Sequence, residues 1–236
     1  MTTLSRKLVA ECVGTALLLC AVVGSGIMGD RLAGGSVGLA LLANSIATGA
    51  ALVAIILAFG AISGAHLNPA VTLADATQGG IPWAIVLPYV VVQCAGAVIG
   101  VVTAHVMFGE PPVSWSATAR NGSGQVIGEF VATFGLLSVI WGTVRSRPAA
   151  VPFAVGAYIT AAYWFTSSTS FANPAVTIAR TMTDTFAGIR AADALPFIGA
   201  QLAGAAAATL LFRWLVPALP HMAARVVVPH ETGETQ

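Results

Sequence analysis

The chain has 236 residues, of which 57% are hydrophobic and only 8% are charged. Soluble domains carry about a quarter of charged residues, so this chain cannot cover itself with polar groups, and its expected solvent is membrane lipid. The net charge of +1 offers no basic patch for nucleic acid, and the three cysteines lie in apolar segments without metal-ligand spacing. We therefore expect no nucleic-acid partner, no metal site and no resident cofactor.

Six segments are long and apolar enough for membrane-spanning helices, each of which needs about 20 mostly apolar residues. Turn-forming sequences such as Gly79-Gly80-Ile81-Pro82 separate them. The first segment runs beyond the apolar core of a signal peptide, so we expect it to be retained as a helix. The segments are 8–28, 38–61, 83–106, 126–145, 150–168 and 194–216.

Two further apolar segments are too short to span a bilayer. One runs from Asn68 to about Thr77 and the other from Asn173 to about Asp184, and each closely follows a predicted span. Such segments indicate re-entrant half-helices, which a membrane tolerates only where protein or a water-filled lumen surrounds them.

The basic residues predict the orientation, because cytoplasmic loops are enriched in lysine and arginine. An even number of spans places both termini on one side. With the termini inside, six basic residues lie in inner segments and four in outer ones. This bias predicts a multi-pass protein of the plasma (inner) membrane with both termini in the cytoplasm. The inner residues are Arg6, Lys7, Arg145, Arg147, Arg213 and Arg225, and the outer ones are Arg31, Arg120, Arg180 and Arg190.

The strongest feature of the sequence is an internal duplication. Segment 66–72, His-Leu-Asn-Pro-Ala-Val-Thr, recurs as segment 171–177, Phe-Ala-Asn-Pro-Ala-Val-Thr. The sequence around Glu11 in the first span is echoed around Glu129 in the fourth. Each half, 1–115 and 120–236, therefore holds three spans and one half-helix, and the odd number of spans inverts the second half. Inverted repeats place a shared site near the bilayer midplane.

Two Asn-Pro-Ala boxes in register with six spans resemble the aquaporin, or major intrinsic protein, family, and the resemblance covers nearly the whole chain. It implies a single all-α channel domain, 1–236, of six tilted helices with two half-helices that meet head to head. It also implies a homotetramer with one pore in each subunit.

The two boxes have the chemistry of helix starts that face a pore. Asparagine is a favoured N-cap and proline suits the first helical position. Each asparagine can point amide hydrogens into the lumen, and both half-helices aim their positive dipole ends at the centre. This arrangement repels cations and interrupts a proton wire. The predicted central constriction consists of Asn68, Pro69, Ala70, Asn173, Pro174 and Ala175.

Ionisable residues inside apolar spans are functional by default. Glu11 and Glu129 could form a proton relay, or each could accept hydrogen bonds from the non-helical backbone before its half-helix. Their symmetric placement favours the second interpretation. His66, two residues before Asn68, is expected to be a hydrogen-bonded neighbour of that loop, with a pH-sensitive gate as the alternative.

In many members of the family an arginine directly follows the second box and forms an outer filter with three other residues. Here that position is Val176, which brings no charge and less bulk. Counting from the boxes without insertions places the other three positions at Thr48, Ala161 and Ser170, or at Ala162 if the count slips by one. We expect a wide, weakly polar and uncharged filter. Arg180, one turn beyond Val176, either leans over the outer vestibule or pairs with Asp184 at i+4, and we favour the pairing.

The expected function is a passive channel for small uncharged solutes, and no residue set of an enzyme is visible. The run from Phe171 to Ile189 resembles a bacterial subgroup found in arsenic-resistance contexts, which implies permeability to arsenite and antimonite as well as polyols and water. A channel whose main cargo is water or glycerol is the alternative. A coupled transporter or ion channel is a further one, although the second, third, fifth and sixth spans hold no acid.

Overall fold

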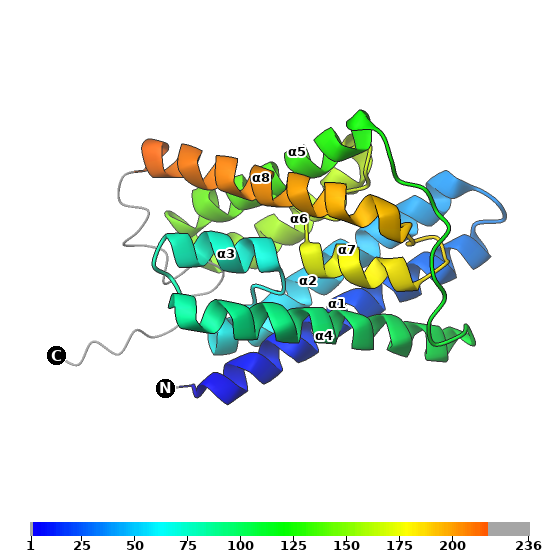
Figure 1. The fold of residues 1–236 in the computed structure, drawn as a ribbon, viewed down its shortest axis with the longest axis horizontal. Coiled ribbons are helices and arrows are strands. Elements are labelled where there is room, and N and C mark those ends of the chain that lie inside the picture. The colour runs from blue at the N-terminus through cyan, green and yellow to red at the C-terminus, as the bar shows by residue number, and fades with distance from the viewer. Residues whose placement is uncertain (1, 217–236) are drawn as a thin grey trace.

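The computed structural model describes residues 2–216, and within that range the chain is all helical without a strand. The long helices lie roughly side by side along the long axis of the molecule (Figure 1). Arg225 and the last part of the expected second repeat lie outside the described residues. The helices are α1 (Leu4–Leu32), α2 (Val37–Ser63), α3 (Pro69–Thr77), α4 (Trp83–Phe108), α5 (Ser123–Val144), α6 (Val151–Phe165), α7 (Pro174–Ala179) and α8 (Ala191–Leu215), with single 3₁₀ turns η1 (Pro148–Ala150) and η2 (Arg180–Met182).

Six of these helices correspond to the predicted spans. Five of them, α1, α2, α4, α5 and α8, are long and apolar enough by themselves to cross a membrane. Helix α6 has only 15 residues, about 22 Å of helix, but the turn η1 directly before it extends it toward the roughly 30 Å of a hydrocarbon core. The prediction of an all-α membrane protein with six spans and two short half-helices is confirmed.

The two ends of the bundle differ in what covers them. Helix α1 begins and helix α8 ends at the same end, which we call the terminal end (Figure 1). The long loop 109–122 crosses the opposite end, which we call the loop end. This loop is held by backbone hydrogen bonds from Ser114 to Met182 (3.1 Å) and from Ser116 to Thr181 (2.9 Å). The segment after α7 is therefore packed under the loop.

Small residues let the long helices approach closely. A Cβ atom added at Gly49 of α2 would lie 2.7 Å from the Gly156 carbonyl oxygen of α6, and one added at Gly156 would lie 2.6 Å from that of Gly49. Glycines also face backbone where α4 meets α1, at Gly96, and where α8 meets α5, at Gly204. Membrane helices lack a hydrophobic driving force between them and use such close backbone contact instead.

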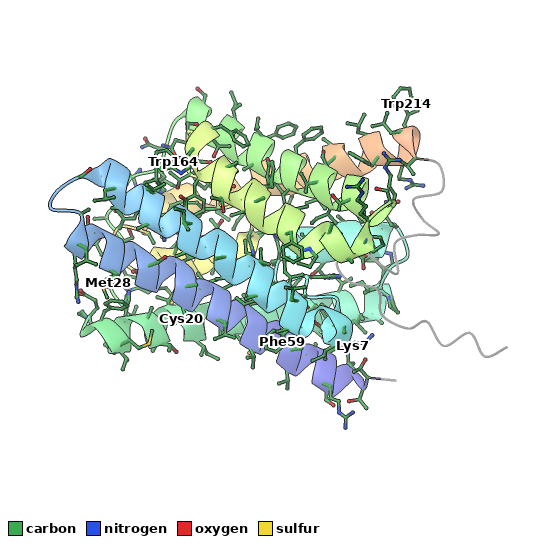
Figure 2. The ribbon with its side chains drawn as sticks, turned by 180° about the vertical axis from the view of Figure 1, so that it is seen from behind. Lys7, Cys20, Met28, Phe59, Trp164 and Trp214 are labelled. Atoms are coloured by element: carbon green, nitrogen blue, oxygen red, sulfur yellow. The ribbon has the colours of Figure 1, made fainter. Side chains whose placement is uncertain are left out.

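The surface of the bundle is apolar, as expected of a protein solvated by lipid. Side chains such as Leu87, Leu195 and Trp214 are largely exposed. Figure 2 shows Trp214 and Lys7 near one end of the bundle and Trp164 and Met28 near the other. Tryptophans near both ends match the aromatic belts of membrane proteins.

Candidate functional site

The two half-helices start at their asparagines, and each asparagine is tied to the other repeat. The Asn68 Oδ1 atom accepts from the Ala70 N–H (2.9 Å), and its Nδ2 donates to the Ala172 carbonyl (2.8 Å). In the same way, the Asn173 Oδ1 atom accepts from the Ala175 N–H (3.0 Å), and its Nδ2 donates to the Leu67 carbonyl (2.8 Å). A carboxamide has two N–H donors, so each asparagine keeps one for another partner.

Both asparagines lie on the wall of one elongated cavity, in which about 60 Å³ is open to the centres of water molecules. Since about 10–15 Å³ of this measure holds one water, the cavity has room for a short file of them. Most of its lining is aliphatic side chains, and its polar lining comprises the two asparagines with the loops before them and Thr48, Tyr163 and Arg180. The aliphatic residues are Leu18, Val22, Leu52, Ile56, Val71, Leu136, Ile140, Val155, Ile159 and Val176.

The other four residues of the boxes are buried but do not line this cavity. Successive helical residues point about 100° apart. In each half the asparagine and the third helical residue, Val71 or Val176, face the cavity. The proline and alanine between them therefore point away from the cavity and pack against protein. The expectation that the whole boxes form the constriction is therefore corrected to the asparagines alone. The residues that lie behind the wall are Pro69, Ala70, Pro174 and Ala175.

The loops that precede the half-helices adopt an unusual backbone. Leu67 has φ 52° and its repeat counterpart Ala172 has φ 50°. The left-handed region costs a residue with a side chain about 1–2 kcal/mol. Such residues persist only where the surrounding structure fixes them, so the contacts of these loops matter.

The two buried glutamates supply those contacts. Glu11 accepts hydrogen bonds from the His66 N–H (3.0 Å) and the Leu67 N–H (2.7 Å). Glu129 accepts from the Phe171 N–H (2.8 Å) and the Ala172 N–H (2.9 Å). Both carboxylates are fully buried and neither lines the cavity. The geometry matches the interpretation that they hold the loops and not the proton-relay alternative.

Two glutamines complete these clusters, and the sequence reasoning missed them. Gln93 Nε2 donates to Glu11 (2.8 Å) and to Thr72 Oγ1 (2.9 Å). Gln201 Nε2 donates to Glu129 (2.6 Å) and to Thr177 Oγ1 (2.8 Å). A signal existed, because Gln-Cys-Ala-Gly-Ala at 93–97 recurs as Gln-Leu-Ala-Gly-Ala at 201–205.

Toward the loop end, three of the four expected filter residues line the cavity: Thr48, Ser170 and Val176. Ala161 does not. It lies exposed on the outside of α6, whose lining residues are Val155, Ile159 and Tyr163. The Tyr163 hydroxyl lies 3.2 Å from Thr48 Oγ1. Two residues correspond to a rotation of about 200° around a helix. The count that predicted Ala161 instead of Tyr163 therefore selects the opposite face of α6 from the one that lines the cavity. Ala162 is buried and also absent from the wall.

Arg180 is also a lining residue, so the cavity wall at this end carries a basic side chain beside the residues expected to form an uncharged filter. Its side chain is buried at 2% exposure, its Nε donates to the Ala187 carbonyl, and its Cζ atom lies 3.4 Å from the centre of the Phe171 ring. The expected pairing with Asp184 does not form, because Asp184 Oδ1 accepts the Ala117 N–H (3.0 Å).

A second arginine, which sequence reasoning did not connect with the site, lies behind Phe171. Arg120 of the loop places its Cζ atom 5.1 Å from the centre of that ring and donates from Nε to the Gly188 carbonyl (2.7 Å). Burial lowers the pKa of the Arg120 guanidinium below its ordinary value, and the Glu129 carboxylate acts in the opposite direction.

Toward the terminal end, His66 lines the cavity. Its Nδ1 atom lies 3.2 Å from Thr72 Oγ1 and its Nε2 atom 3.5 Å from Asp75 Oδ2. His66 is thus the hydrogen-bonded neighbour of the loop that the sequence predicts. Asp75, which the sequence reasoning missed, is buried in α3 and absent from the cavity wall.

Comparisons with known proteins agree with this geometry. A family model described as "Major intrinsic protein" matches residues 1–167. Aquaglyceroporin AqpS of Rhizobium meliloti (strain 1021) is 52% identical over 218 residues, which cover 92% of this chain and 93% of that protein. Aquaporin Z of Bradyrhizobium diazoefficiens is 32% identical over 228 residues, which cover 89% and 93%. The X-ray structure of the aquaglyceroporin from Plasmodium falciparum has a TM-score of 0.72 at 20% identity and covers 92% of this chain and 99% of its own, which supports the fold.

Proposed function

Because this chain belongs to the major intrinsic protein family, it is a passive membrane channel and not an enzyme, and we propose that it conducts polyols, arsenite and antimonite as well as water. One observation carries this proposal. The cavity has a mostly aliphatic lining together with fewer polar groups, among them the two asparagines and the loops before them. A solute with hydroxyl groups on one side and a less polar body can satisfy both surfaces.

The loop end of the cavity favours hydroxylated solutes in particular. The Ser170 hydroxyl is buried on the cavity wall and has no hydrogen-bond partner among the described residues. A hydroxyl both donates and accepts, so Ser170 is available to a passing solute. Val176 and Thr48 are small enough to leave room beside it. Arsenous acid is a neutral trihydroxide at pH 7 with the outline of a polyol, and it fits the same description.

The alternative of a channel used mainly for water or glycerol has the same pore and differs only in the main cargo. A coupled transporter or ion channel needs charged groups along an ion path. None of the described residues that line the cavity is acidic, and this favours a passive pore for neutral solutes.

Flux into proteoliposomes tests the proposal. Water, glycerol and arsenite would be applied in matched gradients, with empty vesicles as the control. We expect all three fluxes to exceed the control and none to respond to an imposed proton gradient. Flux of water alone would overturn the polyol and arsenite proposal, and uphill uptake driven by protons would overturn the passive channel.

We also propose that the chain forms one channel domain, 1–236, with repeats 1–115 and 120–236, and assembles as a homotetramer in the plasma membrane with its termini in the cytoplasm. The shared pattern of asparagine, glutamate and glutamine contacts in the two halves supports the repeat. The short basic segment around Arg145 and Arg147, near the terminal end, supports the orientation. Native mass measurement in detergent would test the tetramer, and labelling of single cysteines placed in loop 109–122 would test the orientation.

A further inference from the structure

We propose that Arg180 supplies the positive charge that excludes cations at the loop end of this pore, from a position one helical turn beyond the one that Val176 occupies. The inference deepens the proposed channel function and rests on it. It assigns a specificity-determining role to a residue whose guanidinium and Phe171 form part of the same cavity wall as Val176 and Ser170.

The geometry of a helix explains how a later residue can serve this position. Arg180 follows Val176 by four residues, so the two lie on nearly the same face and about 6 Å apart along the axis. Side chains of a helix lean toward its N-terminus and cover the preceding turn. The long side chain of Arg180 therefore extends back toward the level of Val176, and its contact with the ring of Phe171, which precedes the half-helix, agrees with this direction.

Two groups hold the guanidinium in place, and a third packs against one of them. Its Nε donates to the Ala187 carbonyl, and its Cζ atom lies over the Phe171 ring. The same ring packs edge-on against Phe197, at 5.3 Å between ring centres. A cation over an aromatic face is stabilised by the ring quadrupole. Arg180 is therefore a fixed charge of the wall and not a mobile side chain of the vestibule.

Arg180 forms no close ion pair among the described residues. Among residues 2–216 the ion pairs within 4.0 Å involve Arg31, Arg190 and His66, and none includes Arg180. The nearby Arg120 adds charge of the same sign on the Phe171 ring. A fixed positive charge in a narrow pore raises the barrier for cations and leaves neutral solutes nearly unaffected. Val176 then leaves the pore wide while Arg180 provides the charge, whereas an arginine directly after the box would bring charge together with bulk.

Proteoliposomes that contain the whole chain can separate charge from width. Sodium permeability would be measured beside glycerol permeability for the wild type and Arg180→Gln, with Arg31→Gln, at an exposed arginine of the loop end, as the matched control. We expect Arg180→Gln to raise the ratio of sodium permeability to glycerol permeability about tenfold or more, and Arg31→Gln to leave this ratio as in the wild type. An unchanged ratio in an Arg180→Gln channel that conducts glycerol would overturn the inference.

A variant that keeps the charge gives a second test. Arg180→Lys should exclude sodium as the wild type does, whereas Arg180→Gln should not. A rise in sodium permeability that is as large in Arg180→Lys as in Arg180→Gln would contradict the role of the Arg180 charge. A wild type that conducts no glycerol would instead contradict the channel proposal itself, so the two failures are distinguishable.

Discussion

The two half-helices of this channel share their architecture and differ in their chemistry. In each half, the residue seven positions after the asparagine lies against the residue two positions before it. At the terminal end this pair is Asp75 with His66, at 3.5 Å, and at the loop end it is Arg180 with Phe171, at 3.4 Å. The residue seven positions after the asparagine is therefore acidic in one half and basic in the other.

This difference shows which residues the two repeats must share and which can differ between them. The asparagine caps, the buried glutamates and the glutamines are the same in both halves, because each loop with left-handed residues needs the same hydrogen-bond acceptors and donors. The pair of residues on either side of the box has diverged: His66, Phe171 and Arg180 line the cavity, and Asp75 lies behind its wall. We therefore expect selectivity between solutes to depend on positions outside the boxes.

The largest predicted effect is a loss of stability on substitution of the two buried glutamates, which occupy equivalent positions in the two halves. Glu11→Gln and Glu129→Gln each place an amide NH₂ against backbone N–H groups and leave buried donors without an acceptor. Each should lower the free energy of unfolding by about 1–3 kcal/mol for every buried donor left without an acceptor, measured as a lower unfolding temperature in detergent. Glu110→Gln, at an exposed ion pair with Arg31, is the control and should cost less than about 1 kcal/mol. Similar losses would support equivalent roles, and a loss in only one half would contradict them.

A smaller effect is expected from Val176→Arg, which adds bulk and a second charge to the loop-end wall. Glycerol and arsenite permeability should fall about tenfold, and water permeability should fall less, because a narrower pore excludes larger solutes first. Stopped-flow light scattering on vesicles with each solute would measure the ratio. Equal losses for water and glycerol, or no loss for either, would show that Val176 does not limit the passage.

Mercurial reagents probe the same end through Ser170. Cys12, Cys20 and Cys94 are partly buried and absent from the cavity wall, so the wild type should lose less than about half of its water permeability. Ser170→Cys places a thiol on the wall and should make inhibition several-fold stronger. Strong inhibition of the wild type would mean that one of the three native cysteines reaches the pore.

The smallest predicted effect on permeability is that of substituting Asp75 at the terminal end. Asp75 is buried behind the cavity wall and Arg180 lies on it. Asp75→Asn should therefore leave sodium exclusion and glycerol flux within about twofold of the wild type, in the same assays as Arg180→Gln. A large change in cation permeability in Asp75→Asn would show that both ends of the pore act electrostatically.

The fold and the two asparagines are predictable from the sequence because they rest on span length and on a repeated motif. Tyr163 was missed because counting along a chain assumes a fixed helical register, whereas α6 is short and preceded by a 3₁₀ turn. The pairing of Arg180 with Asp184 assumed that the half-helix continues, but α7 ends at Ala179 and the backbone is extended by Thr183. A spacing of four residues brings side chains together only inside a helix.

The crossed hydrogen bonds of Asn68 and Asn173 bear on how the protein is made in the cell. Asn68 donates to a carbonyl that lies 104 residues later in the chain. During synthesis the first half therefore enters the bilayer before its acceptor exists. An unsatisfied amide inside hydrocarbon costs several kcal/mol, so the early half cannot reach its final arrangement alone. Closure of the pore centre is consequently a late step of biogenesis, and it requires the second half to be inserted.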